Sequence, residues 1–176
     1  MGHLFTVGHS THPIDDFVSL LADRGVNLVV DVRTVPKSRH NPQFWGDALE
    51  ASLSGHAIGY RHLASLGGLR RTSADSVNTG WNNASFRGYA DYMQTEEFAV
   101  GLDELIALSA ENTVAVMCAE AVPWRCHRSL IGDALLVRGF TVDDILSATS
   151  VRPHSLTRFA AVDGLSLTYP PYDEEA

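Results

Sequence analysis

Apolar residues in the first part of the chain form short runs separated by a helical repeat. The run 3–8 (HLFTVG) is rich in strand formers, and a second apolar run covers 27–32. Between them, apolar residues recur at helical spacing over 14–21, and Gly25 ends the helix. A strand, a helix and a second strand within about 30 residues predict a βαβ unit and therefore a parallel sheet.

The same alternation continues along the chain. Further helices are predicted at 44–53, 86–93, 96–109 and 126–138, and further strands at 57–62, 113–117 and 140–146. Residues 69–85 carry Ser, Thr, Asn and Gly without a period, and a loop of that length is typically functional or mobile. The predicted fold class is α/β, with three layers, a mostly parallel sheet and helices on both faces.

Length and composition favour one domain. The 176 residues are 45% hydrophobic and 19% charged, which is typical of a globular chain. We predict a single α/β domain over 1–161 and an acidic, proline-containing C-terminal tail over 162–176 that frays. No run approaches the roughly 18 apolar residues of a membrane span. The two cysteines make no disulfide framework, so we expect a cytoplasmic protein with no membrane partner.

Charge is spread unevenly along the sequence. The net charge is −8, so the surface as a whole is not a nucleic-acid footprint. Residues 33–71 nevertheless hold six basic and two acidic residues, whereas 91–111 hold six acidic and no basic residues. A locally basic face on an acidic protein indicates either a focused anion site or solvated surface loops.

Chemically active residue types follow several predicted strands. In open parallel sheets, ligands bind outside the carboxyl ends of the strands. Four strand ends supply titratable or cationic groups: His9 and Ser10, Asp31 and Arg33, Tyr60 to His62, and the segment from Cys118 to Arg128. Asp31 ends an apolar strand, so we expect it to be partly buried and paired with Arg33 or His9. The pattern predicts a pocket lined by Cys, His and Arg at this edge of the sheet.

The segment from Cys118 to Arg128 is the most distinctive. A cysteine at a strand end, followed by a loop and a helix start, is typical of the cysteine loops of phosphatases and sulfurtransferases. In those loops, backbone N–H groups and the helix dipole stabilise the thiolate while an Arg binds the oxyanion. Here six residues rather than five separate Cys118 from Arg125, and the loop has no glycine. A small, buried and unreactive Cys118 therefore stays open as an alternative.

Other residues of this segment have their own chemistry. Cys126 lies near a predicted helix N-terminus beside Arg125 and His127, which would lower its pKa and make it the more reactive thiol. Glu120 is the best candidate for a general acid or base in the loop. A redox pair of Cys118 and Cys126 is a further alternative, as is a metal site built from cysteines and histidines.

Several separate motifs resemble one known family. The segments 6–10 (TVGHS), 30–33 (VDVR), 88–93 (GYADYM) and 117–128 resemble, in order, the domain of unknown function 488 family over 5–146. The resemblance implies a compact three-layer α/β fold and indicates which residues form the site. It implies no activity, because no activity is established for the family.

These observations lead to one principal hypothesis. The chain is expected to be an enzyme acting on a small anionic substrate, phosphate-like or nucleotide-like. The residues expected to carry the chemistry are Cys118, Glu120, Cys126, His127 and His9. The residues expected to bind the anion are Ser10, Arg33, Arg125 and Arg128.

Two alternatives belong to other functional classes. The first is a non-catalytic module that binds a nucleotide or nucleic acid through the 33–71 face, with Tyr60, Trp81 and Trp124 available to stack bases. The second is a redox or metal sensor that uses the two cysteines. The sequence identifies no cofactor, no substrate and no oligomeric state.

Overall fold

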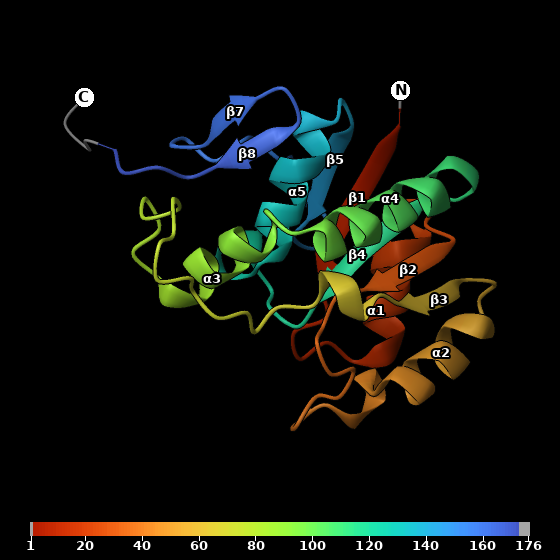
Figure 1. Cartoon of the computed structure of the whole chain (residues 1–176). Coiled ribbons are helices and arrows are strands. Elements are labelled where there is room, and N and C mark those ends of the chain that lie inside the picture. The colour runs from red at the N-terminus through yellow and green to blue at the C-terminus, as the bar shows by residue number, and fades with distance from the viewer. Residues whose placement is uncertain (1, 173–176) are drawn as a thin grey trace.

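A six-stranded sheet forms the centre of the molecule (Figure 1). The computed structural model describes residues 2–172. The sheet strands are β1 (His3–Gly8), β2 (Leu28–Asp31), β3 (Gly59–His62), β4 (Val114–Cys118), β5 (Thr141–Ile145) and β6 (Val151–Pro153). Their spatial order is β3-β2-β4-β1-β5-β6; β6 runs antiparallel to β5, and the other neighbours are parallel. Two further strands, β7 (Ala161–Asp163) and β8 (Ser166–Thr168), form an antiparallel hairpin.

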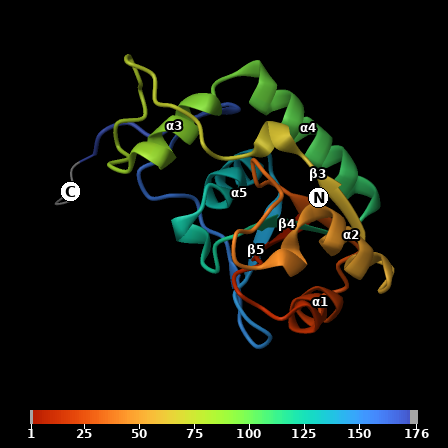
Figure 2. The same ribbon diagram turned by 90° about the horizontal axis from the view of Figure 1, so that it is seen from below.

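Helices cover both faces of the sheet (Figure 2). The helices are α1 (Ile14–Ala22), α2 (Gly46–Ser54), α3 (Ala84–Tyr92), α4 (Glu96–Glu111) and α5 (Arg128–Val137). Helices α1 and α2 pack on one face, and α3, α4 and α5 pack on the other. Within 2–172, no helix combines the length and apolar character needed to cross a bilayer. The three-layer α/β arrangement confirms the predicted fold class.

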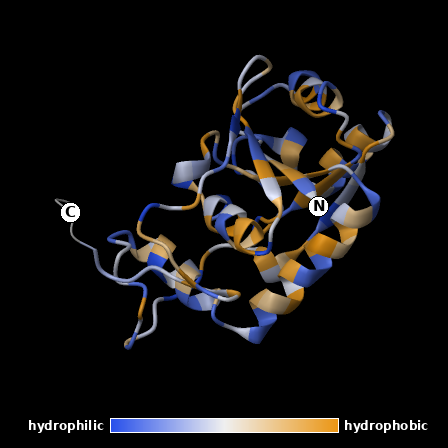
Figure 3. Cartoon of the chain, turned by 90° about the horizontal axis from the view of Figure 1, so that it is seen from above, coloured by the Kyte–Doolittle hydropathy of each residue, from blue (hydrophilic) through white to orange (hydrophobic). Residues whose placement is uncertain are grey.

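Side chains of the central strand β4 alternate between the two layers, as the strand period requires. Ala115 and Met117 pack toward α1 and α2. Val114, Val116 and Cys118 pack toward α4 and α5. All five are buried, which explains the unbroken apolar run in the sequence. Along the helices, Figure 3 shows hydrophobic and hydrophilic positions in alternation, as is typical of helices with one face toward a core. Cys118 therefore ends β4 on the side of the sheet that α5 covers.

Predicted element boundaries differ from the observed ones where the backbone turns. The predicted strand at 57–62 begins at Gly59, because Ala57 takes a left-handed turn conformation with φ of 59°. The predicted helix at 126–138 begins at Arg128, because Cys126 is extended. A short 3₁₀ helix, η3 (Pro123–Arg125), lies before it.

The expected fraying of the chain from Val162 does not hold as far as Tyr169. Leu167 and Tyr169 are buried in the core shared with α4 and α5. The Tyr169 hydroxyl donates to the Asp133 carboxylate on α5 at 2.8 Å. The hairpin thus packs beside α5 (Figure 1), while 173–176 lie outside the described residues.

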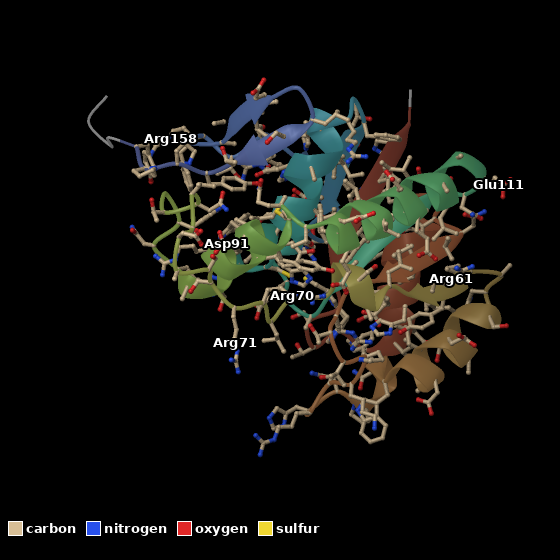
Figure 4. The ribbon with its side chains drawn as sticks, viewed as in Figure 1. Arg61, Arg70, Arg71, Asp91, Glu111 and Arg158 are labelled. Atoms are coloured by element: carbon tan, nitrogen blue, oxygen red, sulfur yellow. The ribbon has the colours of Figure 1, made fainter. Side chains whose placement is uncertain are left out.

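The buried side chain of Asn78 links the long loop at 69–85 to two other elements. The Asn78 amide donates to the Asp91 carboxylate on α3 at 2.8 Å, and its oxygen accepts the Tyr169 backbone N–H at 2.9 Å. Asp91 is labelled on α3 in Figure 4. Asn78 thereby joins the loop to α3 and to the C-terminal hairpin.

Candidate functional site

A cavity of about 590 Å³ opens at the carboxyl ends of β2 and β4. Six of the residues that sequence reasoning selected line it: Arg33, Cys118, Glu120, Arg125, Cys126 and His127. Among the described residues, His9, Ser10 and Arg128 are not part of its lining. The fold therefore brings most of the selected residues to one cavity and gives the other three different surroundings.

Asp31 and Arg33 form a buried ion pair in the cavity wall. The Arg33 Nη2 lies 2.7 Å from Asp31 Oδ2, and its Nε donates to both carboxylate oxygens at 2.9 and 3.1 Å. The Tyr60 hydroxyl donates to the same carboxylate at 2.6 Å, and burial together with this bond raises the Tyr60 pKa. Asp31 is fully buried, more deeply than the partial burial predicted, and it pairs with Arg33 as expected.

His9 contacts the Arg33 side of this ion pair. Its Nδ1–H donates to the Ser10 carbonyl at 2.8 Å, which leaves Nε2 as the acceptor for Arg33 Nη1 at 3.3 Å. The ring stacks on Phe44. Burial, with the Arg33 charge adding to it, lowers the pKa of His9 to about 4, so the ring is neutral at neutral pH. In this arrangement His9 orients Arg33.

Arg128 is fully buried, and no carboxylate among the described residues pairs with it. Its Nη1 donates to the Glu120 carbonyl at 3.1 Å and approaches Cys118 Sγ at 3.4 Å. Its Nη2 donates to the Ala121 carbonyl at 3.3 Å. A phosphatase-like arginine faces its ligand, whereas Arg128 binds main-chain carbonyls and a sulfur. Because a buried cation needs a counter-charge, the Cys118 thiolate is the natural partner.

The surroundings of Cys118 favour its ionised form. Burial raises the pKa of the thiol, but three effects outweigh it: the hydrogen bond with Cys126, the Arg128 charge and the backbone hydrogen bond with Glu120. The net result is a pKa below the ordinary value for Cys118. The side chain is only 1% exposed, yet it contributes to the cavity lining.

Cys126 lies beside Cys118 and has the opposite tendency. The hydrogen bond with Cys118 and burial raise the pKa of the Cys126 thiol. Sequence reasoning expected Cys126 to be the more reactive thiol; its interaction with Cys118 and its burial act against that expectation. Cys126 Sγ also lies 3.4 Å from His127 Nδ1.

His127 is a neutral base in this group. Its Nε2–H donates to the Val32 carbonyl at 2.8 Å, so the lone pair of the neutral ring is on Nδ1, toward Cys126. Burial lowers the pKa of His127, and the Arg128 charge acts in the same direction. The ring therefore stays neutral near pH 7 and can take a proton from the thiol.

The family model described as Domain of unknown function DUF488 matches residues 13–135, from α1 into α5. The match covers more than half of the chain and includes the segment from Cys118 to Arg128. The chain belongs to the DUF488 family. No match was found among curated proteins or among solved structures.

Two cations lie at the mouth of the cavity in this DUF488 protein. Lys37 and Arg125 are both exposed and both belong to the lining. The Lys37 ammonium lies 5.7 Å from the centre of the Trp45 ring. The Arg125 backbone N–H donates to the Val122 carbonyl at 3.3 Å, but its side chain makes no hydrogen bond or ion pair with another residue among 2–172. Its guanidinium is therefore available to an anion.

Parts of the predicted basic face have structural contacts instead. Arg61 lies 3.3 Å from the Glu104 carboxylate, and the Arg70 guanidinium stacks 3.7 Å above the Tyr92 ring. Arg71 is exposed and projects outward, away from the body of the molecule (Figure 4). The face is thus less available for nucleic acid than its charge count indicates.

The aromatic residues considered for base stacking lie in different surroundings. The Tyr60 hydroxyl binds a buried carboxylate. Trp81 packs between Phe86 and Phe159. Trp124 is 56% exposed on η3, outside the cavity lining. They do not form a common stacking surface.

No group of three or more His, Cys, Asp or Glu side chains within 2–172 is placed to hold a metal ion. Cys126 and His127 are in contact, but no third ligand of these types completes a site. The metal form of the sensor hypothesis therefore has no ligand set in this part of the chain.

Sequence reasoning did not select several lining residues. Lys37, Asn83, Ser85, Phe86 and Tyr89 all line the cavity. Asn83 caps α3, since its side-chain oxygen accepts the N–H groups of the first turn. The available signal was the long loop at 69–85 that ends at this cap, because such loops often border binding sites.

Proposed function

We propose that this DUF488 protein is an enzyme that uses the Cys118 thiolate as a nucleophile on a small anionic substrate. One observation carries the proposal. The sulfur lies 3.4 Å from a buried guanidinium that no described carboxylate pairs with, and it lines a cavity of about 590 Å³. Enzymes activate cysteine by placing a cation beside it in this way.

The positive charge at the cavity mouth favours an anionic substrate. Arg125 and Lys37 provide exposed positive charge, and the buried Arg33 lies in the wall. Phe86 and Tyr89 add an aromatic side to the lining. The cavity volume falls within the range of small-molecule sites. These features suit a molecule with one anionic group and one planar or apolar part, such as a nucleotide-like compound.

The proposed chemistry is covalent catalysis. Cys118 Sγ forms a bond to an electrophilic atom of the substrate, and the leaving group departs with the electrons of the broken bond. Glu120, exposed at the cavity, would protonate that group. Water, deprotonated by the same carboxylate, would then cleave the bond to sulfur and restore the thiolate.

Two alkylating reagents of matched chemistry test this proposal. Iodoacetate is an anion and iodoacetamide is neutral, so their rate ratio at Cys118, read by peptide mass spectrometry, measures anion attraction. We expect the iodoacetate-to-iodoacetamide ratio at Cys118 to exceed that of free cysteine by about 10-fold, because a cationic cavity concentrates anions. Arg125→Ala and Lys37→Ala should each lower the ratio mainly by slowing iodoacetate.

Arg71→Ala is the matched control, since Arg71 is exposed and lies outside the cavity lining. It should leave both rates unchanged. The proposal is wrong if Cys118 shows the reagent preference of free cysteine, or if Cys118 reacts with neither reagent in the folded protein.

A further inference from the structure

The two thiols of the cavity have different chemical characters. Cys118 ends β4 and Cys126 precedes α5, with seven residues between them in the chain. In the fold both are buried and both line the same cavity, with Arg128 Nη1 at 3.4 Å from Cys118 Sγ and His127 Nδ1 at 3.4 Å from Cys126 Sγ. We propose that Cys118 and Cys126 act as a nucleophilic and a resolving cysteine that reduce a small hydroperoxide and form an intramolecular disulfide. This inference rests on the proposed Cys118 thiolate.

The first step takes place at Cys118. Its thiolate attacks one oxygen of the peroxide, the O–O bond breaks, and the released hydroxide or alkoxide takes a proton from solvent. Sulfur is oxidised to the sulfenic acid, and the peroxide is reduced to water or an alcohol. The guanidinium Nη1 of Arg128, 3.4 Å from Sγ, stabilises the thiolate that starts this step.

The second step needs a deprotonated Cys126, and His127 provides the base. The lone pair on His127 Nδ1 lies 3.4 Å from Cys126 Sγ, because Nε2–H is held by the Val32 carbonyl. Cys126 gives its proton to His127 and attacks Cys118 Sγ, so the S–S bond forms as the S–OH bond breaks. The departing hydroxide takes the proton from His127. In sum, two thiols and one peroxide give one disulfide and two molecules of water, or water and an alcohol.

The position of the pair also favours a reaction within one chain. Cys118 is 1% and Cys126 7% exposed, so another protein's thiol cannot easily reach them. A small peroxide can enter the cavity that both side chains line. Cys126 is the only other cysteine of the chain and lines the same cavity, so it is the thiol available to a sulfenic acid at Cys118. Closure brings the sulfurs to about 2.05 Å.

The test uses the full reduced chain and one equivalent of hydrogen peroxide, followed by peptide mass spectrometry without reduction. We expect one product, a Cys118–Cys126 crosslink within a single chain. Cys126→Ser should instead accumulate a sulfenic acid at Cys118 that dimedone traps. Cys118→Ser should form no disulfide and leave Cys126 slow to oxidise.

His127→Gln separates the two steps. Glutamine can still donate to the Val32 carbonyl but supplies no base, so disulfide closure should slow by about 100-fold. The rate of sulfenic acid formation at Cys118 should stay unchanged. If His127 had only a structural role, its substitution would be expected to slow both steps. Equal slowing of both steps counts against the assigned role.

The outcomes separate this inference from the proposed function. If iodoacetamide modifies Cys118 rapidly but peroxide gives no intramolecular disulfide, the resolving role of Cys126 is overturned and the nucleophile stands. Disulfides that form only between two chains would also overturn the proposed resolving role of Cys126. If Cys118 resists both reagents, both proposals fail.

Discussion

The central residue-level feature is a buried cation that contacts a thiol and, among the described residues, pairs with no carboxylate. Arg128 bonds two carbonyls and approaches Cys118 at 3.4 Å. Carbonyl dipoles lower the cost of burying the guanidinium, but they do not neutralise it. Under the proposed function, ionisation of Cys118 neutralises this charge, so a thiolate at Cys118 and the buried Arg128 would stabilise each other.

Gly8 permits this arrangement at the end of β1. A Cβ atom at this position would lie 1.6 Å from the Glu120 carbonyl oxygen and 2.8 Å from Arg128 Nη1. We predict that Gly8→Ala lowers the free energy of unfolding by about 3 kcal/mol, because the backbone must move. Urea unfolding measures the change, and Cys118 alkylation should slow in the same variant.

Gly55→Ala is the control for that substitution. At Gly55 the nearest atom to a new Cβ is 3.6 Å away, and φ is −62°. Alanine should therefore leave stability unchanged or raise it by about 0.5 kcal/mol. Equal stability of the Gly8 and Gly55 variants would contradict the close approach of Glu120.

At the scale of elements, one histidine joins the sheet edge to α5. His154 lies next to β6, with Nε2 at 2.9 Å from Asp133 on α5 and Nδ1 at 3.4 Å from Asp144 on β5. Burial lowers the pKa of His154, but hydrogen bonds and charges of the two carboxylates outweigh it and raise the pKa to about 9. Tyr169 after β8 binds Asp133 as well, so the C-terminal elements depend on this group.

This histidine predicts a pH dependence of stability. Its folded pKa of about 9 lies above the unfolded value of 6.5, so the folded state holds the proton more tightly. The stabilisation is complete below about pH 6.5 and is lost as the pH rises through about 9. We predict that His154→Gln lowers the free energy of unfolding by about 2 kcal/mol at about pH 6 and by much less at about pH 10.

Urea unfolding of wild type and variant across this range measures the difference. At each pH the free energy of unfolding of the variant is compared with that of wild type, so the contributions of the other titrating groups cancel. A difference that stays constant, or grows with rising pH, would contradict a charged His154.

The sequence predicted the elements that have a strong period and missed those that lack one. The strands and helices through β5 follow apolar runs and helical spacing. Strands β6, β7 and β8 are three residues each, too short to show a pattern. Tyr169 secures that region through a contact with α5, and such a long-range contact leaves no local signal.

Contacts between residues close in sequence could be predicted at the site, whereas contacts that depend on the fold could not. Arg33 follows Asp31 by two positions, so their pairing could be predicted from adjacency. Arg128 was expected to bind the anion because a guanidinium can hold a phosphate through two hydrogen bonds, yet it is buried in the first turn of α5. Which thiol ionises depends on the contact between Cys118 and Cys126, and the sequence does not contain that contact.

At the scale of the whole molecule, the parallel sheet explains why the site lies where it does. The carboxyl ends of β2 and β4 meet at one edge, and the register pairs Asp31 with Met117, the residue before Cys118. The Asp31–Arg33 ion pair at the end of β2 and the Cys118 thiol at the end of β4 therefore lie beside a common cavity. The loop before α5 supplies Arg125, the segment after β2 supplies Arg33 and Lys37, and 69–85 with α3 closes the opposite side.

The most direct test of this account is the pH dependence of Cys118 alkylation by iodoacetamide in the folded full chain, resolved by peptide mass spectrometry. The account predicts a midpoint below the free-thiol pKa of about 8.5 for Cys118, and slow modification of Cys126 throughout. A Cys118 midpoint at or above about 8.5, or a Cys118 that reacts only after denaturation, would contradict a thiolate at the centre of the site.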